Sequence, residues 1–120
     1  MGTYSNLEVF KKAYQLAMDI FEFSKAFPKE EKYSLTDQIR RCSRSVCSNF
    51  GEAYRRRQYP AHFLSKLTDS DAENSETEIW LKFAFDCGYI NETAFTGLIT
   101  KCAEVGKILG YMLKNPGRFV

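Results

Sequence analysis

The sequence predicts an all-α protein: an up-down-up-down antiparallel four-helix bundle in one domain that covers residues 1–120. Apolar residues recur at intervals of three and four in four long stretches, which is the period of an amphipathic helix. Short connections marked by Pro or Gly separate these stretches, and no run alternates apolar and polar residues as a strand does. Four helices of similar length with short connections favour the antiparallel arrangement.

We expect the first helix to cover about residues 6–27, with Ser5 and Glu8 as a capping box and Pro28 as the stop. Its apolar residues form two adjacent stripes, wider together than the roughly 100° of an ordinary surface helix, so it should contact more than one neighbouring layer. One stripe is Leu7, Phe10, Tyr14, Ala17 and Phe21, and the other is Val9, Ala13, Leu16, Ile20, Phe23 and Phe27. The candidate subunit interface on this helix consists of Val9, Leu16, Ile20 and Phe23.

The second helix is expected at about residues 34–57, starting after Ser34, and the third at about residues 61–87, after Pro60. The middle of the third stretch, "TDSDAENSETE", is polar but contains no Gly or Pro, so we predict one continuous helix with a polar middle. The core face of the second helix is formed by Leu35, Ile39, Cys42, Val46, Phe50 and Ala53.

The fourth helix is expected at about residues 91–114, with Gly88 ending the third helix and Asn91 capping the fourth. Gly106 and Gly110, four residues apart, lie on one side of this helix. Two interpretations remain open: they admit a neighbouring helix or subunit, or they loosen the chain near its end.

Several strings occur in an order and spacing that resemble one known family: "LEVFKKAYQLA", "FPKEEKYSLTDQIRR", "SVCSN", "SETE" and "GYI". The family is that of the bacterial four-helix-bundle proteins encoded in intervening sequences of 23S rRNA genes, and the resemblance covers about residues 7–113. It implies a homopentamer and brings no established enzymatic activity. It also extends to the accessory variability protein of diversity-generating retroelements, a basic pentamer that associates with a reverse transcriptase and with nucleic acid.

Charge is unevenly distributed along the chain, although the net charge is only +2. Residues 32–66 contain eight Lys and Arg against two acids, a net charge of +6, whereas residues 69–92 contain seven acids against one Lys, a net charge of −6. Six arginines of the basic block are candidates for contacts with phosphates. They are Arg40, Arg41, Arg44, Arg55, Arg56 and Arg57.

Three interpretations of these arginines are open: a solvated or ion-paired face, a surface for RNA or another polyanion, or subunit contacts. The guanidinium fork suits carboxylates as well as phosphates, so Arg40 or Arg41 could pair with Glu76 or Glu78 on the third helix. The sequence therefore narrows the functional question to whether these arginines meet phosphates or carboxylates.

The sequence gives little support for a catalytic site or a metal site. A carboxylate-bridged metal site would need Glu-x-x-His motifs, but His62 is the chain's single histidine and no such motif occurs. Cys42 and Cys47 are five residues apart and unsuited to one zinc ion, while Cys42 and Cys102 fall on core stripes. No glycine-rich phosphate loop precedes a helix. We expect no enzyme activity, no metal and no cofactor.

The function expected from the sequence is that of a cytoplasmic, RNA-associated or DNA-associated scaffold. The alternative is a protein-interaction scaffold that recruits an enzyme such as a reverse transcriptase. Four cysteines without a CxxC pair indicate free thiols in a reducing compartment, and the sequence shows no signal-peptide pattern and no apolar stretch of roughly 18 residues. We therefore expect no membrane association.

Overall fold

The computed structural model describes residue 4 and residues 7–119. The described residues form helices and contain no strand, as the sequence predicts. The long helices are α1 (Glu8–Ser24), α2 (Leu35–Arg55), α3 (Pro60–Asp86) and α4 (Glu92–Lys114). Two short 3-10 helices are η2 (Lys29–Glu31), between α1 and α2, and η3 (Pro116–Arg118), after α4.

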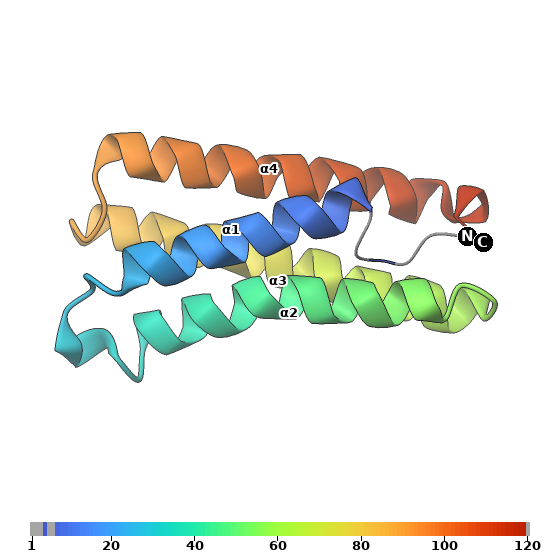
Figure 1. Cartoon of the computed structure of the whole chain (residues 1–120), viewed down its shortest axis with the longest axis horizontal. Coiled ribbons are helices and arrows are strands. Elements are labelled where there is room, and N and C mark those ends of the chain that lie inside the picture. The colour runs from blue at the N-terminus through green and yellow to red at the C-terminus, as the bar shows by residue number, and fades with distance from the viewer. Residues whose placement is uncertain (1–3, 5–6, 120) are drawn as a thin grey trace.

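Consecutive long helices run in opposite directions along the longest axis of the molecule (Figure 1). α1 packs against α2 and α4, and α3 packs against the same two helices, with the most extensive contact between α2 and α3. The overall extents are 44 × 25 × 21 Å. The predicted up-down-up-down bundle is therefore the observed architecture.

The helix ends follow local chemistry at most predicted positions. Pro60 occupies the first turn of α3, where its missing N–H costs no hydrogen bond. Gly88 has φ +79°, a left-handed conformation that glycine adopts without strain, and it ends the third helix. The Asn91 side chain accepts a hydrogen bond of 2.8 Å from the backbone N–H of Ala94 and caps α4.

The first two helices start and stop differently from the prediction. α1 ends at Ser24, three residues early, because residues 25–27 form turns with hydrogen bonds to the residue three positions back. Ser34 makes no side-chain cap; instead a carboxylate oxygen of Glu31 accepts from the N–H of Leu35 at 3.3 Å. Ser5 of the predicted capping box lies outside the described residues.

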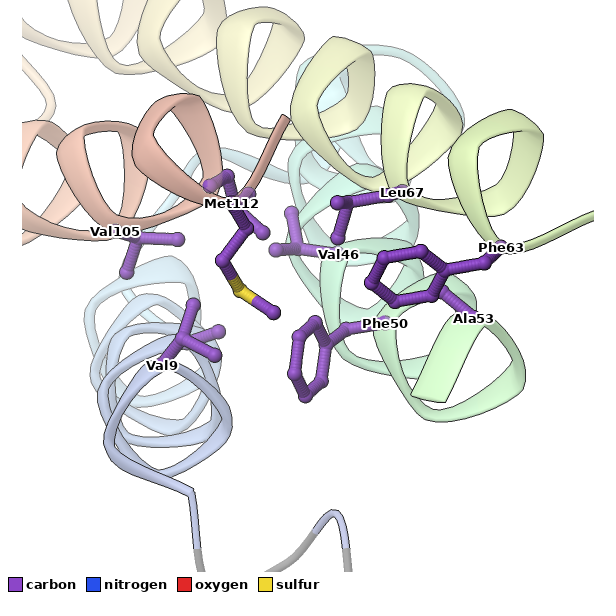
Figure 2. Packing of buried hydrophobic residues seen from close by; sticks show 10 residues of the cluster. Val9, Val46, Phe50, Ala53, Phe63, Leu67, Val105 and Met112 are labelled. Atoms are coloured by element: carbon purple, nitrogen blue, oxygen red, sulfur yellow. The ribbon is translucent and has the colours of Figure 1, made fainter. Parts of the chain in front are cut away.

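The core contains two apolar clusters arranged along the bundle axis. Figure 2 shows one of them, where side chains from all four long helices point toward one another. Its buried members are Val9, Ala13, Val46, Phe50, Ala53, Phe63, Leu67, Val105, Leu109 and Met112. The other cluster is built on Leu16, Ile20, Leu35, Ile39, Leu81, Ala84, Ile90, Leu98 and Cys102.

α3 is continuous through its polar middle, as predicted, and three polar side chains of that middle are buried. The Ser70 hydroxyl donates to the Val46 carbonyl of α2 at 2.7 Å. The Asn74 amide donates to the Cys102 carbonyl of α4 at 3.0 Å, and the Thr77 hydroxyl donates to the α3 backbone. Because each buried group is hydrogen-bonded, this polar layer fixes how α2, α3 and α4 pack against one another.

The predicted subunit interface on α1 is wrong at three of its four positions. Val9, Leu16 and Ile20 are at most 3% exposed because they fill the core of their own bundle, which leaves no surface for a second subunit. Phe23 is 42% exposed and stays a candidate.

The two glycines predicted to lie on one side of α4, Gly106 and Gly110, also differ from one another. A Cβ at Gly106 would lie 3.2 Å from the Asn74 amide nitrogen, so Gly106 admits α3 within the bundle rather than another subunit. Gly110 has open space around its Cβ position and stays a candidate for a subunit contact.

Candidate nucleic-acid interface

Three cationic side chains converge on the ring of Phe21, on the side of the bundle where α1 meets α2. The guanidinium carbons of Arg40 and Arg44 lie 4.9 Å and 5.5 Å from the ring centroid, and Lys25 Nζ lies 4.9 Å from it. Cations are attracted to the face of an aromatic ring, which explains the arrangement. We call Lys25, Arg40 and Arg44 the Phe21 cluster.

Hydrogen bonding fixes one member of the Phe21 cluster further. Arg40 Nε donates to the hydroxyl of Ser24 at 2.7 Å, and that hydroxyl donates to the backbone carbonyl of Phe21 at 2.9 Å. Ser24 is 3% exposed, so this contact anchors the arginine at the edge of the core. No hydrogen bond of the other guanidinium N–H groups is found among the described residues. The arginine is thereby oriented before any ligand arrives.

Nearby carboxylates neutralise only part of the positive charge of the Phe21 cluster. Of its members, Lys25 forms an ion pair of 3.1 Å with Glu22, one turn earlier on α1. No ion pair of Arg40 or Arg44 with a carboxylate is found in the part of the chain that the structure describes. Two guanidinium groups held beside one ring repel each other, and an anion placed between them relieves this repulsion.

Three acidic residues of α3, Asp69, Glu76 and Glu78, contact residues other than the α2 arginines. Lys66 pairs with Glu52 at 3.1 Å and lies 4.0 Å from Asp69, and Lys82 pairs with Glu78 at 3.3 Å. Glu76 accepts a hydrogen bond of 3.1 Å from the indole of Trp80. Arg41 pairs with Asp37 on its own helix at 3.2 Å. The pairing of Arg40 or Arg41 with Glu76 or Glu78, one of the open interpretations, is therefore absent.

A groove of about 540 Å³ runs between α1 and α2 beside the Phe21 cluster. Aromatic rings line the groove: Phe10 and Tyr14 of α1 lie 5.9 Å apart between centroids, and Tyr4, which precedes α1, packs edge-on against Phe10 at 5.0 Å. The Tyr4 ring also lies beside Gly51 of α2. Arg44 and Arg55 line its α2 side, eleven residues apart. The groove thus combines flat apolar surfaces with guanidinium groups.

The other predicted arginines lie at the C-terminal end of α2. Arg56 follows the last residue of α2 and is exposed, and Arg57 lies with its guanidinium carbon 3.5 Å from the centroid of the Tyr54 ring. The six predicted arginines therefore do not form one site. Arg40 and Arg44 join the Phe21 cluster, Arg55 lines the groove, and Arg41, Arg56 and Arg57 lie outside both.

Comparison with known proteins now identifies the family. The model of the 23S rRNA-intervening sequence protein family matches residues 5–111, which is most of the chain. The chain belongs to this family. The resemblance in the sequence motifs is thereby confirmed at the level of the family.

A solved structure supports the same assignment for this 23S rRNA-intervening sequence protein. The crystal structure is of a protein of unknown function from the S23 ribosomal protein family of Bacteroides thetaiotaomicron VPI-5482. It is 29% identical, covers 88% of this chain and 98% of its own, and superposes with a TM-score of 0.80. A comparison with curated proteins finds no match.

Three of the four cysteines of this 23S rRNA-intervening sequence protein are buried or half-buried, and Cys87 is exposed. Cys42 and Cys102 are buried in the core as predicted, and burial raises the pKa of Cys42 to about 11 and that of Cys102 to about 12. Cys47 is half-buried in the groove, where burial raises its pKa to about 11. Thiols with such pKa values are poor nucleophiles at neutral pH.

Residues 4 and 7–119 were compared with the requirements of a metal site and of a membrane-spanning helix. No three His, Cys, Asp or Glu side chains in these residues are placed to hold a metal ion. None of the described helices is both long enough and apolar enough to cross a membrane.

The aromatic wall of the groove is the feature that the sequence interpretation missed. Phe10, Tyr14 and Phe21 belong to the first of the two apolar stripes of α1, and that stripe lines the groove and the Phe21 cluster. The second stripe, from Val9 to Ile20, fills the core. The signal was present in the sequence as an apolar arc too wide for one core face.

Proposed function

We propose that this 23S rRNA-intervening sequence protein is a non-enzymatic, homopentameric scaffold that binds nucleic acid through the arginines of α2. The observation that carries the proposal is the Phe21 cluster, in which Arg40 and Arg44 are oriented by a ring and lie without a carboxylate partner among the described residues. Phosphate groups of a nucleic acid supply the missing anion. RNA is favoured over DNA by the family's association with 23S rRNA genes.

Binding of this kind contacts the backbone of the nucleic acid and depends on its shape and on salt more than on base sequence. Every phosphate contact releases bound counterions, so affinity falls steeply as salt increases. In a pentamer each ligand could meet several copies of the cluster, and avidity would compensate for the weakness of one site.

Titration of a structured RNA hairpin at about 50 mM and about 200 mM salt tests the proposal. The double variant Arg40→Gln/Arg44→Gln should weaken binding. It should also reduce the slope of log K against log salt concentration by an amount that corresponds to the loss of about two phosphate contacts. The matched control is Lys107→Gln/Lys114→Gln, which removes the same charge from exposed positions of α4. It should retain nearly full binding.

Two outcomes would overturn the proposal. One is the lack of any binding of the wild-type protein at low salt. The other is an equal loss of affinity in the α2 and α4 variants, since that would reflect net charge alone rather than the Phe21 cluster.

A second candidate function is the recruitment of a protein partner, such as a reverse transcriptase, by docking its acidic surface. The same observation favours it, because guanidinium groups recognise carboxylates as well as phosphates. A pull-down from the native cytosol with and without nuclease separates the two functions. A partner retained after nuclease treatment supports protein docking, and one that is lost supports binding through nucleic acid.

A further inference from the structure

The groove between α1 and α2 differs from the Phe21 cluster because it offers aromatic faces as well as charge. Tyr14 is 55% exposed and lies on the groove wall, and Met18, one turn further along α1, is 43% exposed. The Tyr14 ring lies 5.9 Å from that of Phe10, which in turn contacts Tyr4. The Tyr14 ring is therefore held beside one other ring while more than half of the residue is exposed.

Charge is placed at intervals along the opposite wall. Arg44 and Arg55 are eleven residues apart on α2, which at 1.5 Å per residue separates their backbones by roughly 16 Å along the helix. Ser48 lies between them in sequence and also lines the groove. Glu52 is the acidic residue of the lining, and its ion pair of 3.1 Å with Lys66 offsets its charge.

The residues that line the groove point to a planar ligand. They include three aromatic rings, one methionine and two arginines but no leucine, isoleucine or valine. A groove that receives an amphipathic helix presents a continuous hydrophobic surface to apolar anchors, whereas flat rings beside guanidinium groups suit stacked bases and phosphates. The groove volume of about 540 Å³ lies within the usual range of ligand sites, roughly 300–1,000 Å³.

We infer that this groove binds a single-stranded segment of nucleic acid several nucleotides long, with a base stacked on Tyr14 and phosphates of the same segment at Arg44 and Arg55. The inference rests on the proposed nucleic-acid function and adds to it a preference for unpaired nucleotides. A duplex keeps its bases stacked inside and presents only its phosphates to the arginines, so Tyr14 contributes nothing to duplex binding.

The test compares two fluorescent probes, a single-stranded oligouridine and an RNA duplex of the same length, in titrations followed by anisotropy. Tyr14→Ala should weaken binding of the oligouridine roughly tenfold, as expected for the loss of one stacked base, and should leave the duplex affinity unchanged. Tyr14→Phe keeps the ring and should retain most of the affinity. The matched control is Tyr111→Ala, which removes a 47% exposed tyrosine from α4.

The Arg40→Gln/Arg44→Gln variant, measured with the same probes, distinguishes the two levels of the hypothesis. If this variant weakens binding of both probes while Tyr14→Ala weakens neither, the single-strand groove is overturned and the proposed function stands. If the wild-type protein binds neither probe, both fall. Circular dichroism of each variant checks that the helical fold is retained.

A competition experiment tests the occupant of the groove against other polyanions. A poly-glutamate peptide of matched charge should displace oligouridine far less effectively than unlabelled oligouridine does, since it has no planar group to stack on Tyr14. Equal displacement by the peptide would overturn the inference, because the groove would then recognise negative charge alone.

Discussion

At the scale of single residues, Phe21 illustrates how one partly buried ring organises charges that come from another helix. Arg40 and Arg44 are four residues apart on α2, and long cationic side chains at such positions ordinarily sample many rotamers. The attraction of both guanidinium groups to the ring, together with the contact of Arg40 with Ser24, restricts them. A site ordered in advance loses less entropy on binding a ligand.

The cysteines give a prediction at the same scale. At pH 8 a thiol reagent should modify Cys87 rapidly and the other three cysteines slowly, because Cys87 is exposed. Burial raises the pKa of Cys42 and Cys47 to about 11 and that of Cys102 to about 12, so their thiolate fractions at pH 8 are very small. Absorbance-monitored modification of the native protein measures the rates.

Cys87→Ser is the control for that experiment and should abolish the fast phase. Raising the pH toward 11 should accelerate modification of Cys47, which is half-buried, before that of the two core thiols. A fast phase that includes Cys42 or Cys102 in the native protein at pH 8 would contradict the burial of these two thiols in the core.

At the scale of helices, the buried polar side chains in the middle of α3 fix the position of this helix along its axis relative to α2 and α4. Ser70, Asn74 and Thr77 are each buried, and two of them donate hydrogen bonds to carbonyls of neighbouring helices. A shift of α3 by one turn would take Ser70 and Asn74 away from these carbonyls in the core, at a cost of about 1–3 kcal/mol for each group left without a partner. An apolar interface alone would tolerate such a shift more easily.

The contact between α3 and α4 gives a prediction based on Gly106. Gly106→Ala should destabilise the protein by about 1 kcal/mol, because the new methyl group displaces the Asn74 amide from its hydrogen bond with the Cys102 carbonyl. In the Asn74→Ala background the same change should be stabilising, by up to about 1 kcal/mol, since only the helix propensity of alanine remains. Urea denaturation of the four proteins in this cycle gives the free energies of unfolding.

Gly97→Ala is the matched control, because a Cβ at Gly97 meets nothing within 4 Å and alanine there should stabilise α4 by up to about 1 kcal/mol. A stabilising effect of Gly106→Ala in the wild-type background, similar to that of Gly97→Ala, would show that Asn74 yields without cost.

The helices also show what could and could not be predicted from the sequence. The continuity of α3, the stop at Gly88 and the cap at Asn91 depend on local chemistry, so the sequence predicts them correctly. The two stripes of α1 are both apolar, and which of them enters the core depends on where the other helices lie. For that reason the sequence pattern places Leu16 at a subunit interface, although it is buried in the core, and does not identify Tyr14 as part of a groove.

At the scale of the whole molecule, the basic and acidic blocks lie on α2 and α3, which are adjacent, without cancelling each other through arginine. The ion pairs at these helices are made by lysines of α3: Lys66 pairs with Glu52 of α2 and lies near Asp69, and Lys82 pairs with Glu78. These pairs are largely exposed. Exposed pairs stabilise a fold by less than about 1 kcal/mol each. The difference in charge between the basic and acidic blocks is therefore retained in the folded protein as a difference in charge between the surfaces of α2 and α3.

The last prediction concerns assembly. We expect light scattering to give a mass about five times that of the 13.9 kDa chain, as the proposed homopentamer requires.

A surface on α3 is a candidate for the contact between subunits. Ile79 and Phe83, four residues apart, are 51% and 52% exposed, and the Trp80 ring lies 5.6 Å from that of Phe83. Ile79→Asp/Phe83→Asp should then dissociate the assembly while circular dichroism shows intact helices, and Tyr33→Asp, at an 85% exposed position outside the long helices, should not. A wild-type protein that scatters as a monomer and stays soluble would contradict the pentamer. A pentamer unaffected by both α3 substitutions would exclude this surface and leave Phe23 and Gly110 as the candidate subunit contacts.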